Sequence, residues 1–401
     1  MNDISPSTLR RIPRGIWALG FVSLLMDVSS EMIHALLPVY LVGTLGLSTL
    51  AVGFIEGIAE STASIVKVFS GALSDWLGRR KLLAAIGYGL AALAKPVFPL
   101  AQTLGWIMAA RFVDRVGKGI RGAPRDALIA ELAPPGMSGA AFGLRQTLDT
   151  TGAYLGPLLA IVLMWLSADD IPRVFWFAVL PACAAFALIA FGVRDVPREA
   201  AERRPRMPLS RSELARLPAL YWWVVAVAAV FTLARFSEAF LVLRAQELKL
   251  ELVWMPLVLV LMNVVYALAA YPFGRLADRL DRGALLAAGF AVLVLADLVL
   301  ALPGGLPGLA AGVMLWGLHM GMTQGLLAAL VADAAPASLR GTAFGMFNLV
   351  CGVTLLLASV LAGELWQRVG AQATFLGGAS FAALALTGLL VLLRLRRTAR
   401  R

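Results

Sequence analysis

The sequence predicts an all-α integral membrane protein with twelve transmembrane helices in two six-helix halves. Hydrophobic residues make up 60% of the 401 residues and charged residues only 15%, more apolar surface than a soluble chain would bury. Apolar runs long enough to cross a bilayer recur along the whole chain. Two segments of the first half also return in the second half at nearly the same offset, which indicates an internal duplication.

The first repeated segment joins two apolar runs. Residues 71–81, GALSDWLGRRK, return 203 residues later as residues 274–282, GRLADRLDR. Both copies carry a glycine, an aspartate four residues later and a basic end. Glycine permits close helix approach, and the basic end is typical of an inner membrane surface.

The second repeated segment follows at an offset of 202 residues. Residues 128–143 match residues 330–345 at eight of 16 positions, and Glu131 in the first copy corresponds to Asp333 in the second. Two copies of one half in a membrane chain are typical of secondary transporters.

The individual spans follow from the rule that a helix needs roughly 20 apolar residues to cross the bilayer. The first run begins behind Arg10, Arg11 and Arg14 and lacks a small-residue cleavage site, so we interpret it as a span and not as a signal peptide. The predicted spans are residues 15–43, 49–71, 82–102, 104–125, 139–166, 172–193, 218–243, 253–275, 283–303, 306–332, 340–366 and 372–395.

The basic residues predict the orientation. The net charge is +11, but arginine and lysine gather at alternate ends of the spans, while the loops near 43–48, 103–105 and 303–306 carry neither. This positive-inside pattern predicts both termini in the cytoplasm and a multi-pass protein of the bacterial inner membrane. Nucleic acid is not an expected partner, because no soluble domain remains to hold it.

The polar stretch in the middle of the chain divides it into two parts. The predicted organisation is an N-terminal bundle at 1–193, a cytoplasmic linker at 194–217 and a C-terminal bundle at 218–401. Cys183 and Cys351 stand alone in apolar runs, so we expect neither a metal pair nor a disulfide. We expect a monomer without a cofactor, and no enzyme, because no nucleophile–base set or phosphate loop is present.

The loop repeat resembles the signature of the major facilitator superfamily, G-x-x-x-D-[RK]-x-G-[RK]-[RK], in both halves. Trp76 and Asp281 are departures from that pattern. The resemblance implies a loop that gates the cytoplasmic side, and the alternative is a loop that only fixes topology. The gating residues would be Gly71, Asp75, Arg79, Arg80, Gly274, Asp278, Arg279 and Arg282.

The fifth span resembles the antiporter signature of the same family. Gly143, Gly152, Gly156 and Pro157 follow the pattern G-x8-G-x3-G-P, although Ala160-Ile161 replaces the usual final glycine pair. The resemblance implies export in exchange for protons. The alternative is an ordinary packing face, because small residues also let helices approach closely.

The first span carries the clearest candidate site. Asp27, Glu31 and His34 are spaced i, i+4 and i+7 and therefore share one helix face near the middle of the span. Ionisable residues at this depth are costly and usually line a pathway. Two carboxylates and an imidazole can bind a divalent metal ion or carry protons. A seam in which the charges only neutralise one another is the alternative.

Further polar residues extend this pathway. In the family resemblance, Arg111 corresponds to a buried arginine linked to proton coupling, although a local i,i+3 pair with Asp114 is an equal alternative. His319 and Met322 resemble a soft-metal pair, but packing explains them as well. The additional pathway residues are Glu56, Glu60, Arg111, Asp114, Asp149, Arg235, Glu238, Asn263, His319 and Met322, with Arg235 and Glu238 expected on one face of the seventh span.

Residues 21–40 and 114–126 are similar to bacterial exporters of the nickel-resistance type, which often end in a histidine-rich tail; this chain ends in arginines. We therefore predict a secondary transporter that exports a cationic substrate, a transition-metal ion or metal complex, in exchange for protons. The first alternative is a multidrug or siderophore exporter of the same fold. The second is a membrane receptor that binds a small molecule without transport.

Overall fold

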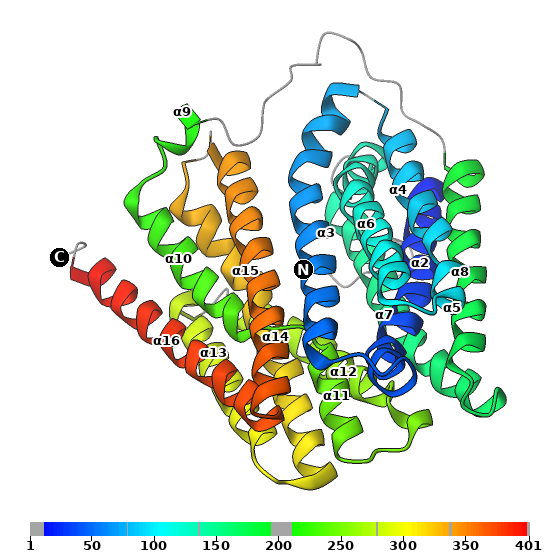
Figure 1. Ribbon diagram of the computed structural model, residues 1–401. Coiled ribbons are helices and arrows are strands. Elements are labelled where there is room, and N and C mark those ends of the chain that lie inside the picture. The colour runs from blue at the N-terminus through cyan, green and yellow to red at the C-terminus, as the bar shows by residue number, and fades with distance from the viewer. Residues whose placement is uncertain are drawn as a thin grey trace. The chain divides into compact units, whose positions relative to one another are not determined.

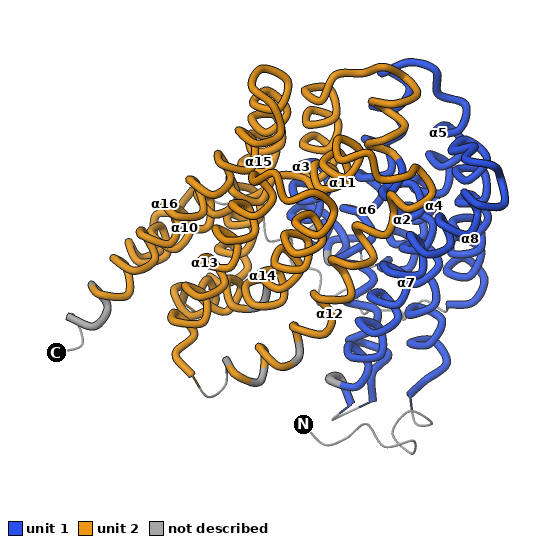
Figure 2. The backbone as a smooth tube through the Cα atoms, turned by 90° about the horizontal axis from the view of Figure 1, so that it is seen from below, with its two compact units in different colours: residues 1–36, 62–207 blue, residues 37–61, 208–401 orange. Residues whose placement is uncertain are grey.

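The computed structural model describes residues 12–77, 79–134, 137–193, 211–277, 280–336 and 339–398. Every regular element in these ranges is a helix. The chain forms two compact units, which Figure 2 colours separately. Unit 1 consists of residues 1–36 and 62–207, and unit 2 of residues 37–61 and 208–401.

The helices of the first half are labelled in Figure 1. They are long, and most run for more than 20 residues without a break. They are α2 (Arg14–Val39) with the π-turn η1 (Tyr40–Thr44), α3 (Thr49–Leu77), α4 (Arg80–Ala94), α5 (Val97–Leu100), α6 (Leu104–Leu132), α7 (Ser138–Leu166) and α8 (Ile171–Gly192).

The second half repeats this order after the short helix α9 (Arg211–Leu214), which lies in the predicted linker. Its Glu213 accepts a hydrogen bond from Thr342. The remaining elements are α10 (Ala219–Ala234), α11 (Ala239–Glu247), η3 (Leu252–Trp254), α12 (Leu257–Ala277), α13 (Arg282–Ala301), α14 (Gly305–Ala334), α15 (Arg340–Arg368) and α16 (Ala371–Thr398).

Among the described residues, eleven helical segments are long and apolar enough to cross a membrane, and the predicted fourth span is not one of them. That span is α6, whose 29 residues could cross a bilayer but include Arg111, Asp114, Arg115, Lys118 and Arg121. Charged side chains are tolerated at this depth when they face the bundle interior, and four of these five are at most 4% exposed. With α6, the structure confirms the predicted all-α fold of twelve spans.

A glycine contact embeds α6 in unit 1. A methyl group at Gly87 of α4 would lie 2.6 Å from the Gly117 carbonyl oxygen of α6, and one at Gly117 would lie 2.5 Å from the Gly87 carbonyl oxygen. Only glycine lets the two backbones approach so closely. The close crossing holds the charged face of α6 inside the unit.

Two predicted spans are interrupted. The third is divided at Lys95-Pro96 into α4 and α5, as expected where proline removes a backbone donor. The seventh ends as α10 at Ala234 and resumes as α11 at Ala239. The expectation that Arg235 and Glu238 share one helical face was therefore wrong, because they lie on opposite sides of this break.

The first part of α3 belongs to unit 2, which differs from the predicted N-terminal bundle at 1–193. The physical reason is another glycine contact. A methyl group at Gly53 would overlap the Ser359 carbonyl oxygen of α15, and one at Gly363 of α15 would lie 2.7 Å from the Thr49 carbonyl oxygen. We call this contact the α3–α15 seam.

Candidate functional site

The candidate site in unit 1 begins where α2 and α7 touch. A methyl group at Gly152 would lie 3.0 Å from the Cβ atom of Asp27, and one at Gly156 would lie 2.8 Å from the Cβ atom of Glu31. Two glycines of the predicted antiporter pattern thus pack directly against the predicted site residues Asp27, Glu31 and His34 on α2, which we call the helix 1 ladder. Gly143, by contrast, would meet nothing within 4 Å, so close packing begins only at the second glycine.

The carboxyl groups of Asp27 on α2 and Asp149 on α7 face each other within hydrogen-bonding reach, and a proton on one of them would let it donate to the other. Two carboxyl groups in such contact cannot both be ionised at moderate cost, so a pair of this kind holds one proton between them. Asp149 is the one predicted pathway residue of α7, and the structure brings it to the first residue of the helix 1 ladder.

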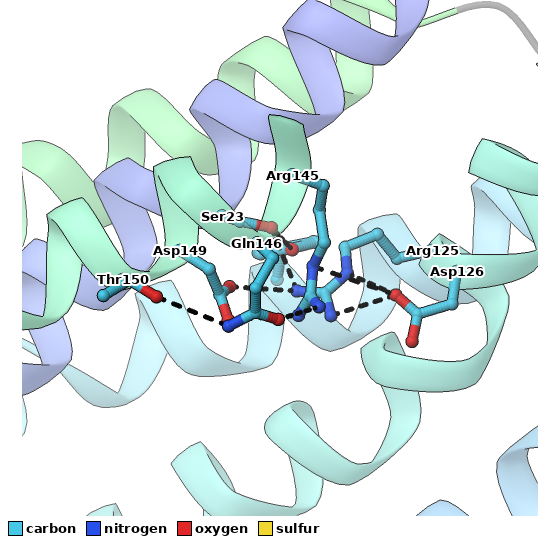
Figure 3. A network of polar contacts seen from close by, with 8 residues as sticks. Ser23, Arg125, Asp126, Arg145, Gln146, Asp149 and Thr150 are labelled. Carbon is cyan, nitrogen blue, oxygen red and sulfur yellow. Dashed lines mark hydrogen bonds and ion pairs between the residues drawn. The ribbon is translucent and has the colours of Figure 1, made fainter. Parts of the chain in front are cut away.

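Two arginines contact Asp149, one member of the carboxyl pair (Figure 3). Arg145 Nη2 lies 3.1 Å from Asp149 Oδ2, and Arg125 Nη1 lies 3.7 Å from Asp149 Oδ1. Arg125 also binds Asp126 at 3.1 Å and donates to Ser23 at 2.9 Å. In the close-up, both guanidinium groups lie between Asp149 and Asp126. Proton loss from the carboxyl pair would therefore be stabilised by a cation already in contact.

A second group of charged side chains lies at the break between α4 and α5. Lys95 Nζ donates to Asp114 Oδ1 at 2.8 Å and to Ser30 at 3.0 Å. Arg115 Nε lies 3.5 Å from the other oxygen of Asp114, and the Lys95, Asp114 and Arg115 side chains are at most 2% exposed. This ion pair links α2, α4 and α6 around Asp114.

These groups form one polar network, which we define by its ionisable residues. Among the described residues it contains six basic and five acidic side chains. Its members are Lys95, Arg111, Arg115, Arg121, Arg125, Arg145, Asp27, Glu31, Asp114, Asp126 and Asp149. The network therefore carries an excess of positive charge.

The predicted metal ligands are not gathered into one site. His34 Nδ1 lies 3.3 Å from Glu31 Oε2, while Asp27 turns to Asp149 instead. In the described part of the chain, no group of three His, Cys, Asp or Glu side chains is arranged to hold a metal ion. Glu31 and His34 remain a two-residue pair, 21% and 11% exposed.

The gating residues are only partly described. Gly71 and the backbone of Asp75 lie near the end of α3, and Arg79 precedes α4. Arg80 binds Glu131 at 2.5 Å, and Arg282 binds Asp333 at 3.3 Å. Gly274 lies in α12, where an added methyl group would meet nothing within 4 Å, while the side chain of Asp75 and residues Asp278 and Arg279 lie outside the described part.

The predicted pathway residues of unit 2 are distributed over α3, α12, α14 and the break between α10 and α11. His319 on α14 is 0% exposed and contacts the rings of Phe231 and Trp316. Met322 is buried on the same helix and Asn263 is half-buried on α12. Glu56 (fully buried) and Glu60 (half-buried) lie on the part of α3 that belongs to unit 2, and Arg235 and Glu238 flank the break between α10 and α11.

Sequence reasoning missed Lys95 and Arg125 as site residues. Neither residue is among the predicted pathway or gating residues. The available signal for Lys95 was a lysine directly before a proline within an apolar run, since a buried lysine needs a partner and a proline marks a helix break. For Arg125 no sequence signal separates a surface arginine from one bound to Asp149.

Residues 19–358 and 255–401 match the family model described as Major Facilitator Superfamily. A relative from Methanocaldococcus jannaschii, described as an uncharacterized MFS-type transporter, is 32% identical over 391 residues, 96% of this chain and 95% of that protein. The multidrug resistance protein MdtH of Photorhabdus laumondii is 30% identical over 169 residues, 40% of this chain and 39% of that protein. The crystal structure of a POT family transporter in complex with a thioalcohol-conjugated peptide has a TM-score of 0.79 at 12% identity and covers 97% of both chains. The family and the fold are those of transporters and not of enzymes, and the chain belongs to the major facilitator superfamily.

Proposed function

We propose that the protein is a proton-coupled exporter of small organic molecules, in which the Asp27–Asp149 pair carries the exchanged proton. The observation that carries this proposal is the contact between the two carboxyl groups, with Arg125 and Arg145 beside Asp149. A shared proton can leave such a pair without producing an uncompensated negative charge, because the arginines neutralise the second carboxylate that forms.

The helix contact supports coupling between this proton and the movement of α7. Gly152 and Gly156 hold α7 against α2 at the two carboxylates of the ladder. A change in the charge of the pair therefore acts at a tightly packed interface. Such an interface switches between two discrete arrangements and does not deform continuously. Protonation would favour one arrangement and proton loss the other.

The substrate class follows from the charge of the polar network. A network with more basic than acidic side chains repels a bare metal cation and attracts an acidic group. We therefore favour the predicted multidrug or siderophore exporter over the export of a free metal ion, and we infer a substrate that carries a carboxylate or a similar acidic group. The resemblance to a multidrug resistance protein over 169 residues agrees with organic substrates.

Export of a transition-metal ion is the second candidate. The contact of 3.3 Å between His34 Nδ1 and Glu31 Oε2 favours it, since imidazole and carboxylate are both ligands of such ions. A substrate or a movement of α2 would have to supply the other ligands, because the described residues bring no third one to this pair. A metal complex with an acidic chelator satisfies both candidates.

Transport in proteoliposomes with an imposed pH gradient tests the proposal. We expect fluorescein, an organic anion, to move against its gradient while protons move in the opposite direction, and Asp27→Asn to abolish both movements. The cation ethidium and Ni²⁺ are run in parallel. Movement of Ni²⁺ alone would favour the second candidate, and transport of any probe that persists unchanged after collapse of the pH gradient would overturn proton coupling.

The orientation is part of the same proposal. The positive-inside pattern favours both termini in the cytoplasm, with Arg80–Glu131 and Arg282–Asp333 at the cytoplasmic ends of their helices. With this orientation the paired loops at 71–81 and 274–282 act as the cytoplasmic gate. Labelling of a cysteine introduced at Arg79 from the cytoplasmic side only, in intact cells against everted vesicles, checks the assignment.

A further inference from the structure

Asp297 lies on α13, four residues before the helix ends at Ala301, and has no role in the proposed site. Its side chain is 0% exposed, and neither carboxylate oxygen has a hydrogen-bond partner among the described residues. An ionised carboxylate in such a place loses its hydration and gains nothing in return. The arrangement is therefore that of a neutral carboxylic acid, which holds a proton.

The carboxyl group lies beside the break in the seventh span. A methyl group at Gly378 of α16 would lie 2.6 Å from Asp297 Oδ2 and 2.9 Å from the Cε1 atom of Phe236, a residue of the break between α10 and α11. Phe236 and Gly378 thus cover Asp297 together. Glycine at position 378 leaves space for the carboxyl group of Asp297, and any larger side chain at this position would occupy that space.

The elements packed around Asp297 offer it no counter-ion. Residues 371–393 of α16 contain no charged side chain, and the described structure records no hydrogen bond or ion pair of Asp297 with any group. The titratable and charged residues of the packed elements are His319 and Asp333 on α14, Arg394, Arg396 and Arg397 at the end of α16, Arg235 and Glu238 at the break, and Arg244 of α11, which donates to the Leu302 carbonyl oxygen at the end of α13. Asp333 is paired with Arg282 and lies at the end of α14.

The duplication gives this carboxyl group a counterpart. Asp297 stands 202 residues after Lys95, the same offset that relates the two copies of the second repeated segment, with Glu131 and Asp333. In the first half Lys95 is bound to Asp114 at 2.8 Å. The residue 202 positions after Asp114 is Trp316, so the second half keeps an ionisable group at this position without its charged partner.

We propose that Asp297 is a second proton-binding site, in the C-terminal half, whose proton is released when the break at 235–238 moves and admits water. The inference rests on the proposed proton coupling. In the step, the O–H bond of the carboxylic acid breaks, the proton passes to water, and a carboxylate remains on Asp297. The break is the part of the seventh span that can bend without loss of further helical hydrogen bonds, which places a movable cover over the acid.

Infrared spectroscopy tests the protonation without transport. The purified protein in detergent at neutral pH should show the C=O stretch of a buried carboxylic acid that disappears in Asp297→Asn. Asp27→Asn removes the other proposed acid and separates the two bands. Absence of any carboxylic-acid band that depends on Asp297 would overturn the proposal, whether or not the protein proves to be proton-coupled.

Transport tests the role of the proton. In proteoliposomes with fluorescein, Asp297→Asn should lose accumulation driven by the pH gradient but keep downhill exchange, because asparagine mimics only the protonated state. Gly378→Ala should shift the pH dependence of transport, while Gly377→Ala, which meets only a Leu365 methyl group at 3.0 Å, should not. Full pH-driven accumulation by Asp297→Asn beside an active wild type would refute the inference alone; an uncoupled wild type would refute the proposed function.

Discussion

Arg80 and Glu131 form, between α4 and α6, the same ion pair that Arg282 and Asp333 form between α13 and α14. Arg80 Nη1 lies 2.5 Å from Glu131 Oε1, and Arg282 Nη1 lies 3.3 Å from Asp333 Oδ2. Both partners are separated from their counterparts by 202 residues. Within each half, one ion pair thus connects the first repeated segment with the second. The duplication preserved this contact.

Burial decides which of the two ion pairs contributes more to the free energy of unfolding. The side chains of Arg80 and Glu131 are 11% and 22% exposed, whereas those of Arg282 and Asp333 are 45% and 51% exposed. A double-mutant cycle with Arg80→Gln and Glu131→Gln should give a coupling energy of about 1–2 kcal/mol in thermal unfolding, against less than about 0.5 kcal/mol for Arg282→Gln and Asp333→Asn. Equal coupling in the two cycles would contradict the ranking by burial.

The glycines of α7 allow a matched test within one pattern. A methyl group at Gly156 would lie 2.7 Å from the Val28 carbonyl oxygen, which cannot move aside, so Gly156→Ala should destabilise the protein by about 1–3 kcal/mol and impair transport. Gly143→Ala meets nothing within 4 Å and should be neutral or stabilising by up to about 1 kcal/mol. Thermal unfolding in detergent and fluorescein transport measure both effects, and similar losses in the two variants would contradict the packing argument.

Proton sharing predicts how the carboxyl pair responds to neutralisation. If Asp27 and Asp149 hold one proton between them, then Asp27→Asn, Asp149→Asn and the double variant should lose pH-driven transport to the same extent, because each removes the whole unit. Asp169→Asn, at an exposed position with φ 64 that asparagine tolerates, is the control. Additive losses in the double variant would show that the two residues act separately.

Sequence periodicity and the repeats were sufficient for the fold class and for the family, because both depend on apolar length and on short motifs. The helix 1 ladder and the glycines of α7 were each visible, but their contact was not, since it depends on how two helices cross. Lys95 directly precedes a proline in an apolar run, which is a local signal of a buried charge, but nothing local identifies Asp114 as its partner or shows that Asp297 has none among the described residues. Only the offset of 202 residues links them, and it becomes informative once the ion pair of Lys95 is known.

The buried ion pair of Lys95 predicts an asymmetric response to mutation. Asp114→Asn should destabilise the protein by about 3–5 kcal/mol, because it removes the carboxylate bound to the buried Lys95 and one of the partners of the buried Arg115. Lys95→Met should cost less, since Asp114 keeps Arg115 at 3.5 Å. Lys118→Met, an exposed position on the same helix, serves as the control for thermal unfolding. A larger loss for Lys95→Met than for Asp114→Asn would contradict the assignment of Asp114 as the centre of this group.

The α3–α15 seam predicts a shift between conformers. Gly53 packs against the Ser359 carbonyl oxygen, and the Ser359 hydroxyl accepts a hydrogen bond of 3.3 Å from the backbone N–H of Ser237 at the break in the seventh span. Gly53→Ala must push α3 away from α15 and should favour any conformer in which the seam is open. Labelling of Leu50→Cys by a maleimide, with Cys183 and Cys351 replaced by serine, should therefore accelerate in Gly53→Ala. Gly105→Ala, which meets nothing within 4 Å, is the control, and equal labelling rates in the two variants would show that the seam does not bias the conformers.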